Sequence, residues 1–158
     1  MGYLKKQREP CILFLEAVFG TGIHPETLTK AGWAVECFAD HFRDANGRVK
    51  DGILDPQIIR LCNANKWVLV TMDKQMRFTH VETIKQTEIG IIATTDCNRP
   101  PEVWIQALIR AKARIERCVK KHPRPWFARL GSTGALTVET IQPEASTRRH
   151  RPKEGQEH

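Results

Sequence analysis

Four short apolar runs, separated by helical patterns, constrain the fold of this chain more than any other feature of its sequence. They cover Ile12–Leu15, Trp33–Phe38, Trp67–Thr71 and Ile89–Thr94. Short runs rich in Val, Ile, Trp and Phe are typical of strands that are buried on both faces of a parallel sheet. The helical patterns between them cover His24–Ala31, Pro56–Asn65 and the region around His80–Gln86. Strands that alternate with helices predict right-handed βαβ units and a three-layer α/β/α domain.

A longer helix and a hairpin follow the fourth run. Apolar residues recur at spacings of four and three from Trp104 to Cys118, which predicts one amphipathic helix from about Pro101 to Lys121. Beyond it, two apolar segments flank a Gly-Ser-Thr-Gly sequence at residues 131–134, a pattern typical of a β-hairpin. The expected sheet is therefore mainly parallel, with a C-terminal β-hairpin.

The ends of the chain differ in composition from its middle. Residues 1–10 form a basic extension, residues 11–141 hold the predicted domain, and residues 142–158 are predicted to be a disordered tail, since they are polar and lack periodicity. The net charge is +7, of which residues 1–10 supply +2 and residues 144–158 supply +1. The domain itself is therefore basic, which favours an anionic partner.

Two general classes of protein are disfavoured. No apolar run approaches the roughly 20 residues of a membrane span, and the first run is too short for a signal peptide. We therefore expect a cytoplasmic protein with no membrane partner. The cysteine count is five, with no C-x-x-C pair, which argues against a disulfide framework or a zinc knuckle. Cys11, Cys37 and Cys62 lie in apolar stretches and are expected to be small buried side chains.

Acidic residues stand where the predicted strands end. Glu16, Asp40, Asp73 and Asp96 follow the four runs, and Asp55 begins a helical pattern. Because the C-terminal ends of parallel strands share one edge, we expect these acids in the crevice where open α/β sheets bind ligands. Clustered carboxylates repel one another unless a cation is present. Carboxylate oxygens suit Mg²⁺ or Mn²⁺, so the sequence predicts a divalent metal site at this edge.

Each acid also has a purely structural interpretation. Asp55 directly before Pro56 is a good helix N-cap. Asp73 and Asp96 can cap the turns that follow them, and Asp40 lies in a polar connection where a solvated charge is expected. Only the shared edge favours a joint role.

Other motifs point to weaker hypotheses. Gly20-Thr21-Gly22 and Asp40 match part of a dinucleotide-binding pattern, but Pro25 occupies the place of its third glycine. Phosphate-loop, zinc-protease and serine-hydrolase motifs are missing from the sequence. His41 and His80 are set apart from any zinc-ligand pattern.

Basic residues accompany the long helix and the third strand. A row with helical spacing consists of Arg110, Arg114, Arg117 and Lys121. Such a row is either a solvated helix face or a track for an RNA backbone, and the sequence leaves both open. Lys74 and Arg77 follow Asp73 closely enough to bind a phosphate near the carboxylates.

In order and spacing, these segments resemble the PIN-like nuclease domains, in particular the VapC-type toxin group with a shortened PIN core. The matching segments are Ile12–Glu16, Ala31-Gly32-Trp33, Asp40-His41-Phe42, Asp55-Pro56, Trp67–Lys74, Ile115-Glu116-Arg117 and Pro125–Arg129. The resemblance extends over residues 11–139.

The resemblance implies a PIN-like domain with the activity of a Mg²⁺- or Mn²⁺-dependent endoribonuclease, commonly the toxin of a toxin–antitoxin pair. Carried over by position, Glu16, Asp55 and Asp73 are the expected catalytic and metal-binding acids, and Asp96 is a further candidate ligand. The implied partners are RNA, held by Lys74, Arg77 and the basic row of the long helix, and a cognate antitoxin protein. A homodimer is left open.

The chain departs from the family pattern at two positions. Glu16 stands where the family usually has Asp, and Gln75 stands where many relatives carry a second acid. An alternative function is therefore a non-catalytic PIN-like module that binds RNA or a protein partner. Metal-dependent cleavage separates the two hypotheses.

Overall fold

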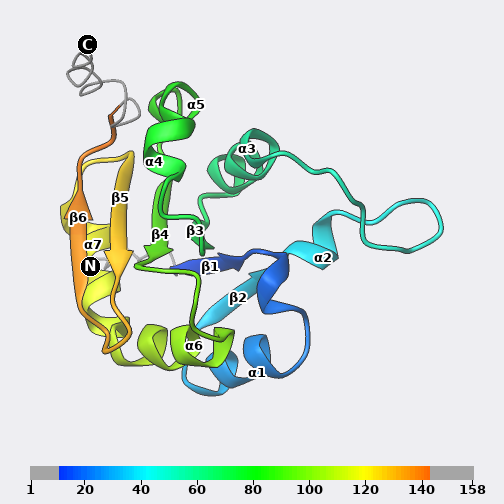
Figure 1. The fold of residues 1–158 in the computed structure, drawn as a ribbon, viewed down its shortest axis with the longest axis horizontal. Helices are drawn as coiled ribbons and strands as arrows, with labels where there is room; N and C mark the ends of the chain where they lie inside the picture. The colour runs from blue at the N-terminus through cyan, green and yellow to red at the C-terminus, as the bar shows by residue number, and fades with distance from the viewer. Residues whose placement is uncertain (1–10, 143–158) are drawn as a thin grey trace, which may run out of the picture.

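The computed structural model describes residues 11–142, in which strands and helices alternate along the chain (Figure 1). The strands are β1 (Ile12–Leu15), β2 (Ala34–Cys37), β3 (Val68–Thr71), β4 (Gly90–Thr94), β5 (Trp126–Leu130) and β6 (Leu136–Glu139). The helices are η1 (Ala17–Phe19), α1 (Ile23–Lys30), α2 (Phe38–His41), α3 (Asp55–Asn65), α4 (Met76–Thr79), α5 (Val81–Lys85), α6 (Pro101–Arg110) and α7 (Lys112–Lys121). The predicted extension at residues 1–10 and nearly all of the predicted tail lie outside the described residues.

The six strands form one sheet in the order β2-β1-β3-β4-β5-β6. The first five strands are parallel, and β6 pairs antiparallel with β5. The predicted α/β class, the mainly parallel sheet and the C-terminal hairpin are therefore confirmed. Since all five parallel strands point the same way, the loops that follow them leave the sheet at one edge.

Helices cover both faces of this sheet, and each face has its own apolar core. Alternate strand residues point to opposite faces, so Leu13 and Leu15 belong to one core and Phe14 to the other. Helices α1, α6 and α7 close the first core, which includes the fully buried Trp104. Helices α3, α4 and α5 close the second, where Met76 is fully buried. Both faces are buried, which explains why the parallel strands are continuously apolar.

The predicted single helix over residues 101–121 is wrong, because the chain forms two helices that meet at Ala111. Ala111 has φ −89° and ψ 4°, outside helical values, and is fully buried. The hairpin turn packs directly against this point: a Cβ atom on Gly134 would lie 3.0 Å from Cβ of Arg110. Gly134 also has φ +98°, which favours glycine. The close approach of the turn accompanies the break.

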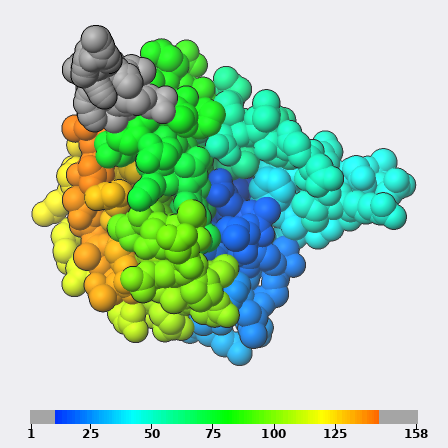
Figure 2. Space-filling model, in the orientation of Figure 1, coloured from blue at the N-terminus to red at the C-terminus, as the bar shows by residue number. Residues whose placement is uncertain are grey.

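A long exposed loop, residues 42–54, projects from the body between α2 and α3 (Figures 1 and 2). It holds itself together by local bonds. The Asp44 carboxylate accepts the N–H groups of Asn46 and Arg48, and Arg43 pairs with Val49 in an isolated bridge. The loop leads directly into Asp55, at the start of α3.

The five cysteines are all free thiols. Cys37 and Cys62 are buried as predicted, whereas Cys11 is only partly buried and Cys97 is exposed. Burial raises the pKa of the Cys62 thiol. Within residues 11–142, no helix has the length and apolar character needed to cross a membrane.

Candidate active site

The strand order reverses next to β1, and this reversal locates the crevice of the sheet. From β1 the chain crosses to β2 on one side, and from β2 it returns to β3 on the other side of β1. The loops after β1 and β3 therefore diverge, and ligands of open α/β sheets bind at such a point. Glu16 directly follows β1, and Asp73 lies two residues after the end of β3.

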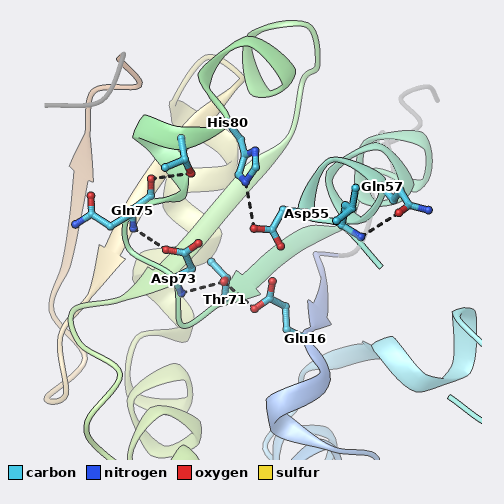
Figure 3. Close-up of polar contacts among 9 residues, drawn as sticks. Glu16, Asp55, Gln57, Thr71, Asp73, Gln75 and His80 are labelled. Carbon is cyan, nitrogen blue, oxygen red and sulfur yellow. Dashed lines mark hydrogen bonds and ion pairs between the residues drawn. The ribbon is translucent and has the colours of Figure 1, made fainter. Parts of the chain in front are cut away.

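Glu16 is held by the end of β3. The Thr71 hydroxyl donates a hydrogen bond of 2.7 Å to Oε1 of Glu16, and the Met72 N–H donates a second bond to the carboxylate. Thr71 is fully buried, and its Oγ1 also accepts the N–H of Asp73 at 3.0 Å. One buried threonine thus links two of the predicted acids (Figure 3). The sequence analysis assigned no role to Thr71, a polar residue at the end of an otherwise apolar strand.

The electrostatics of the site centre on Glu16, whose pKa is raised from 4.5 to about 7. Burial is the largest cause, and the negative charges of Asp55 and Asp73 raise the pKa further. The hydrogen bonds from Thr71 and Met72 act in the opposite direction but do not compensate. The charges of Asp55 and Asp73 therefore reach Glu16, and the three predicted acids interact.

Asp55 does not cap its helix. The residue before it, Leu54, takes the N-cap position of α3, and the Gln57 side chain accepts the N–H of Leu54 at 2.9 Å. The N-cap role predicted for Asp55 is therefore wrong, because Leu54 takes the N-cap position and its N–H donates to the Gln57 side chain. The Asp55 carboxylate instead lies 3.2 Å from Nε2 of His80 (Figure 3).

His80 belongs to the site, although its sequence position indicated no role there. It lies between the short helices α4 and α5, and both it and Asp55 are half-buried. A protonated His80 forms an ion pair with Asp55, and a neutral one forms a hydrogen bond. The only sequence signal for this contact is that His80 follows β3, in the connection that leaves the shared edge of the sheet.

Asp73 is exposed and its backbone is fixed by local bonds. Its Oδ1 accepts the N–H of Gln75 at 2.9 Å, and its carbonyl accepts the N–H of Met76. The turn-capping interpretation of Asp73 is thus confirmed, and it coexists with the effect of this carboxylate on Glu16. Glu16, Asp55 and Asp73 surround Thr71 in Figure 3.

The other two acids have different surroundings. Asp96 pairs with Arg99 at 3.5 Å and accepts the N–H of Asn98 at 3.0 Å. Asp40 is exposed on α2. Neither is among the charges that raise the pKa of Glu16. The cluster consists of three acids rather than five.

The donor chemistry of the cluster fits a hard divalent cation, because carboxylate oxygens are ligands that such ions prefer. Within the described part of the chain, however, no three His, Cys, Asp or Glu side chains are arranged as a ready-made metal site. The carboxylates each have another partner: Thr71, His80 and the N–H of Gln75.

The predicted RNA-contacting residues occupy two separate regions. Lys74 is exposed next to Asp73. Arg77 contacts the hairpin: it donates to the carbonyl of Thr140 at 2.9 Å and lies 3.6 Å from Glu139. It therefore ties α4 to the hairpin, and this placement does not favour the predicted phosphate contact.

The basic row of the long helix lies at the opposite side of the sheet from β2. Arg114, Arg117 and Lys121 line a groove beside β6, and Arg110 is exposed at the end of α6. β6 is three strands from β3, and neighbouring strands are about 4.8 Å apart, so the row lies about 14 Å or more from the carboxylates. The structure thus brings the three acids together and sets the basic row apart.

Comparisons of the chain with protein-family models, with curated proteins and with solved structures find no match. The α/β architecture and the carboxylate cluster therefore stand on the geometry alone. Any closer family assignment and any activity belong to the proposal that follows.

Proposed function

We propose that this chain is a PIN-like, metal-dependent endoribonuclease, and that it acts as the toxin of a toxin–antitoxin pair. The observation that carries the proposal is the interacting cluster of Glu16, Asp55 and Asp73 at the crevice of the sheet, with the pKa of Glu16 raised to about 7. Acids whose pKa values are shifted by burial and by one another, in a ligand crevice, are typical of functional sites.

Glu16, Asp55 and Asp73 would hold Mg²⁺ or Mn²⁺. A bound ion would lower the pKa of a water molecule and neutralise charge on the scissile phosphate. Since the acids are not a ready-made ligand set here, we expect binding to be accompanied by movement of their side chains. Metal binding also removes the cost of ionising Glu16, so it should lower the pKa of that carboxyl group.

The remaining residues of the site have supporting roles. Thr71 orients Glu16 through its 2.7 Å hydrogen bond, and His80 orients Asp55. Lys74 is the exposed cation next to the cluster and is the proposed contact of an RNA phosphate. The RNA contact predicted for the basic row, Arg110, Arg114, Arg117 and Lys121, stays a prediction, and the shape of the neighbouring groove offers a competing assignment.

The test is cleavage of a mixed RNA substrate with Mn²⁺ or Mg²⁺, with EDTA as the metal-free control. Asp73→Asn should abolish cleavage, because the amide keeps the local turn but loses the charge that binds the cation. Asp96→Asn is the matched control, since Asp96 lies outside the cluster, and it should cleave at the parent rate. Equal cleavage by the parent and by Asp73→Asn would show that the assignment of the carboxylates is wrong.

The second candidate is a non-catalytic PIN-like module that binds RNA or a protein partner. It is favoured by the arrangement of the carboxylates, which have protein partners rather than the geometry of a metal site. A pure parent protein that binds RNA in EDTA and cleaves none with either metal would establish this candidate over the enzyme.

A further inference from the structure

A groove runs between α7 and β6, at the side of the sheet opposite to β2. It encloses about 220 Å³, and α7 contributes Arg114, Arg117, Cys118 and Lys121, while β6 contributes Leu136 and Val138. Leu136 packs against the apolar core below, and Val138 is 40% exposed. The groove therefore has an aliphatic floor and a cationic wall. Figure 2 shows β6, in orange, at the rim of the molecule.

The outer side of β6 offers unpaired backbone groups to this groove. In the hairpin, the N–H of Gly131 donates to the carbonyl of Ala135, and the register continues with Arg129 opposite Thr137. Hydrogen-bonded pairs alternate in an antiparallel ladder, so Thr137 and Glu139 bond to β5. The N–H and C=O groups of Leu136 and Val138 point away from β5. Among the described residues β6 is the last strand of the sheet, so no further strand pairs with them.

Among residues 11–142, no acidic residue lines the groove. Glu139, at the end of β6, lies on the opposite face of the sheet, where Arg129 and Arg77 neutralise it. Arg114 is held in the wall by its 3.1 Å hydrogen bond to the carbonyl of Gly134. A ligand that fits this surface must supply negative charge, aliphatic side chains and strand-like backbone hydrogen bonds.

We propose that the groove binds an acidic, extended segment of a partner protein, which adds to β6 as a further strand. Backbone pairing with Leu136 and Val138 supplies affinity. Every second side chain of the added strand faces α7, and these side chains include both aliphatic groups that cover the floor and acids that meet Arg114, Arg117 and Lys121. This surface is separate from the carboxylate cluster, and the proposal does not depend on the proposed nuclease activity.

Other occupants fit the surface less well. A second copy of the chain, paired through β6, would place two α7 rows of cations on the same face of the joined sheet, where they repel. The chain's own residues 144–158 carry a net charge of +1 and do not complement the wall. Single-stranded RNA usually stacks its bases on several aromatic side chains, and His122 is the only aromatic ring in the lining among the described residues.

The experiment uses the full chain and a fluorescent seven-residue peptide with the sequence Glu-Thr-Val-Thr-Val-Thr-Glu, in which the Glu and Val side chains share one face of the strand. We expect saturable binding that weakens with salt. In hydrogen exchange, the peptide should slow the outward-facing N–H groups of Leu136 and Val138. The N–H of Thr137, which already bonds to β5, should change little. This alternation is specific to strand addition, because a peptide lying elsewhere on the groove would not produce it.

Two kinds of variant locate the site. Val138→Pro removes an outward N–H at an edge position, where proline is tolerated, and should weaken peptide binding about tenfold. Arg117→Glu should weaken it by a similar factor, whereas Lys120→Glu should not, since Lys120 is exposed on the same helix and does not line the groove. The charge variants keep the proposal testable even if Val138→Pro fails to fold.

Four results would overturn the proposal. The first is the absence of peptide binding, and the second is equal binding of a peptide with Lys in place of its acids. The third is a dimer of the chain that Val138→Pro dissociates, which would assign the edge to self-association. The fourth is binding of an oligouridine in EDTA that Arg117→Glu weakens and Lys120→Glu does not, and with which the peptide does not compete. That result would assign the basic row to RNA.

Discussion

Replacing Glu16 by Gln should stabilise the fold, and the gain should grow with pH. The carboxyl group has a pKa of about 7 in the folded chain and 4.5 as its ordinary value. Below about pH 4.5 the group is protonated in both the folded and the unfolded chain, so its charge has no effect. Between pH 4.5 and 7 the unfolded chain loses the proton first, and the folded chain is progressively destabilised.

The size of the effect follows from this difference in pKa. Each unit corresponds to about 1.4 kcal/mol, so the charge on Glu16 costs the fold about 3 kcal/mol at pH 8 and less than about 1 kcal/mol at pH 5. The amide introduced by Glu16→Gln carries no charge, and its oxygen can still accept the hydrogen bond of Thr71. For a chain of this size, about 3 kcal/mol corresponds to a rise in Tm of up to about 10 °C.

The assay is thermal unfolding of the parent and of Glu16→Gln in EDTA at pH 5, 6, 7 and 8. Glu88→Gln, at an exposed acid, serves as the control for a simple loss of one negative charge. The quantity to compare is the difference in Tm between variant and parent at each pH, since any constant effect of the amide cancels. A difference that stays the same from pH 5 to pH 8 would refute the electrostatic argument for the cluster.

The remaining predictions concern the metal, the core and the thiols. Millimolar Mn²⁺ or Mg²⁺ should raise the Tm of the parent at pH 8, since a metal at a hundredfold excess over its Kd stabilises the folded chain by about 2.7 kcal/mol. The rise in Tm of Glu16→Gln should be smaller. Calorimetry that finds no shift of Tm with either ion would count against a metal site. Gly90→Ala should destabilise the fold by about 2–3 kcal/mol in urea unfolding, because its Cβ would lie 2.4 Å from the Trp126 ring, whereas Gly131→Ala, whose Cβ would meet nothing closer than 3.6 Å, should be close to neutral. With a thiol reagent in native buffer, Cys97 should react quickly and Cys62 only on unfolding, so fast labelling of both would contradict the burial of Cys62.

The sequence predicts the strands well because strands that are buried on both faces of the sheet consist of continuous apolar runs. Val68, Leu69 and Val70 are all buried, and a short continuous apolar run of this kind is typical of a strand in a parallel sheet. The helix over residues 101–121 could not be predicted correctly from its periodicity. The apolar stripe continues through Ala111, and the break occurs where Gly134 approaches from a turn more than 20 residues later.

The site shows the same division between local and long-range information. The edge shared by Glu16, Asp55 and Asp73 follows from strand order and could be predicted. The contact of His80 with Asp55 joins two segments that no local pattern relates, and so does the bond of Arg77 to the carbonyl of Thr140. The predicted N-cap of α3 was one residue too late, because Leu54 takes that position and donates its N–H to the Gln57 side chain.

The strand order also bears on how the chain can assemble during synthesis. Once β1 and β2 are paired, β3 joins at the other edge of β1, and β4, β5 and β6 then join one after another at that same growing edge. Each strand leaves the ribosome in the order in which the sheet needs it, so the exposed edge at any moment is covered by the next segment to emerge. Until β3 arrives, the hydrophobic edge of β1 has no partner on that side and is open to pairing with another strand.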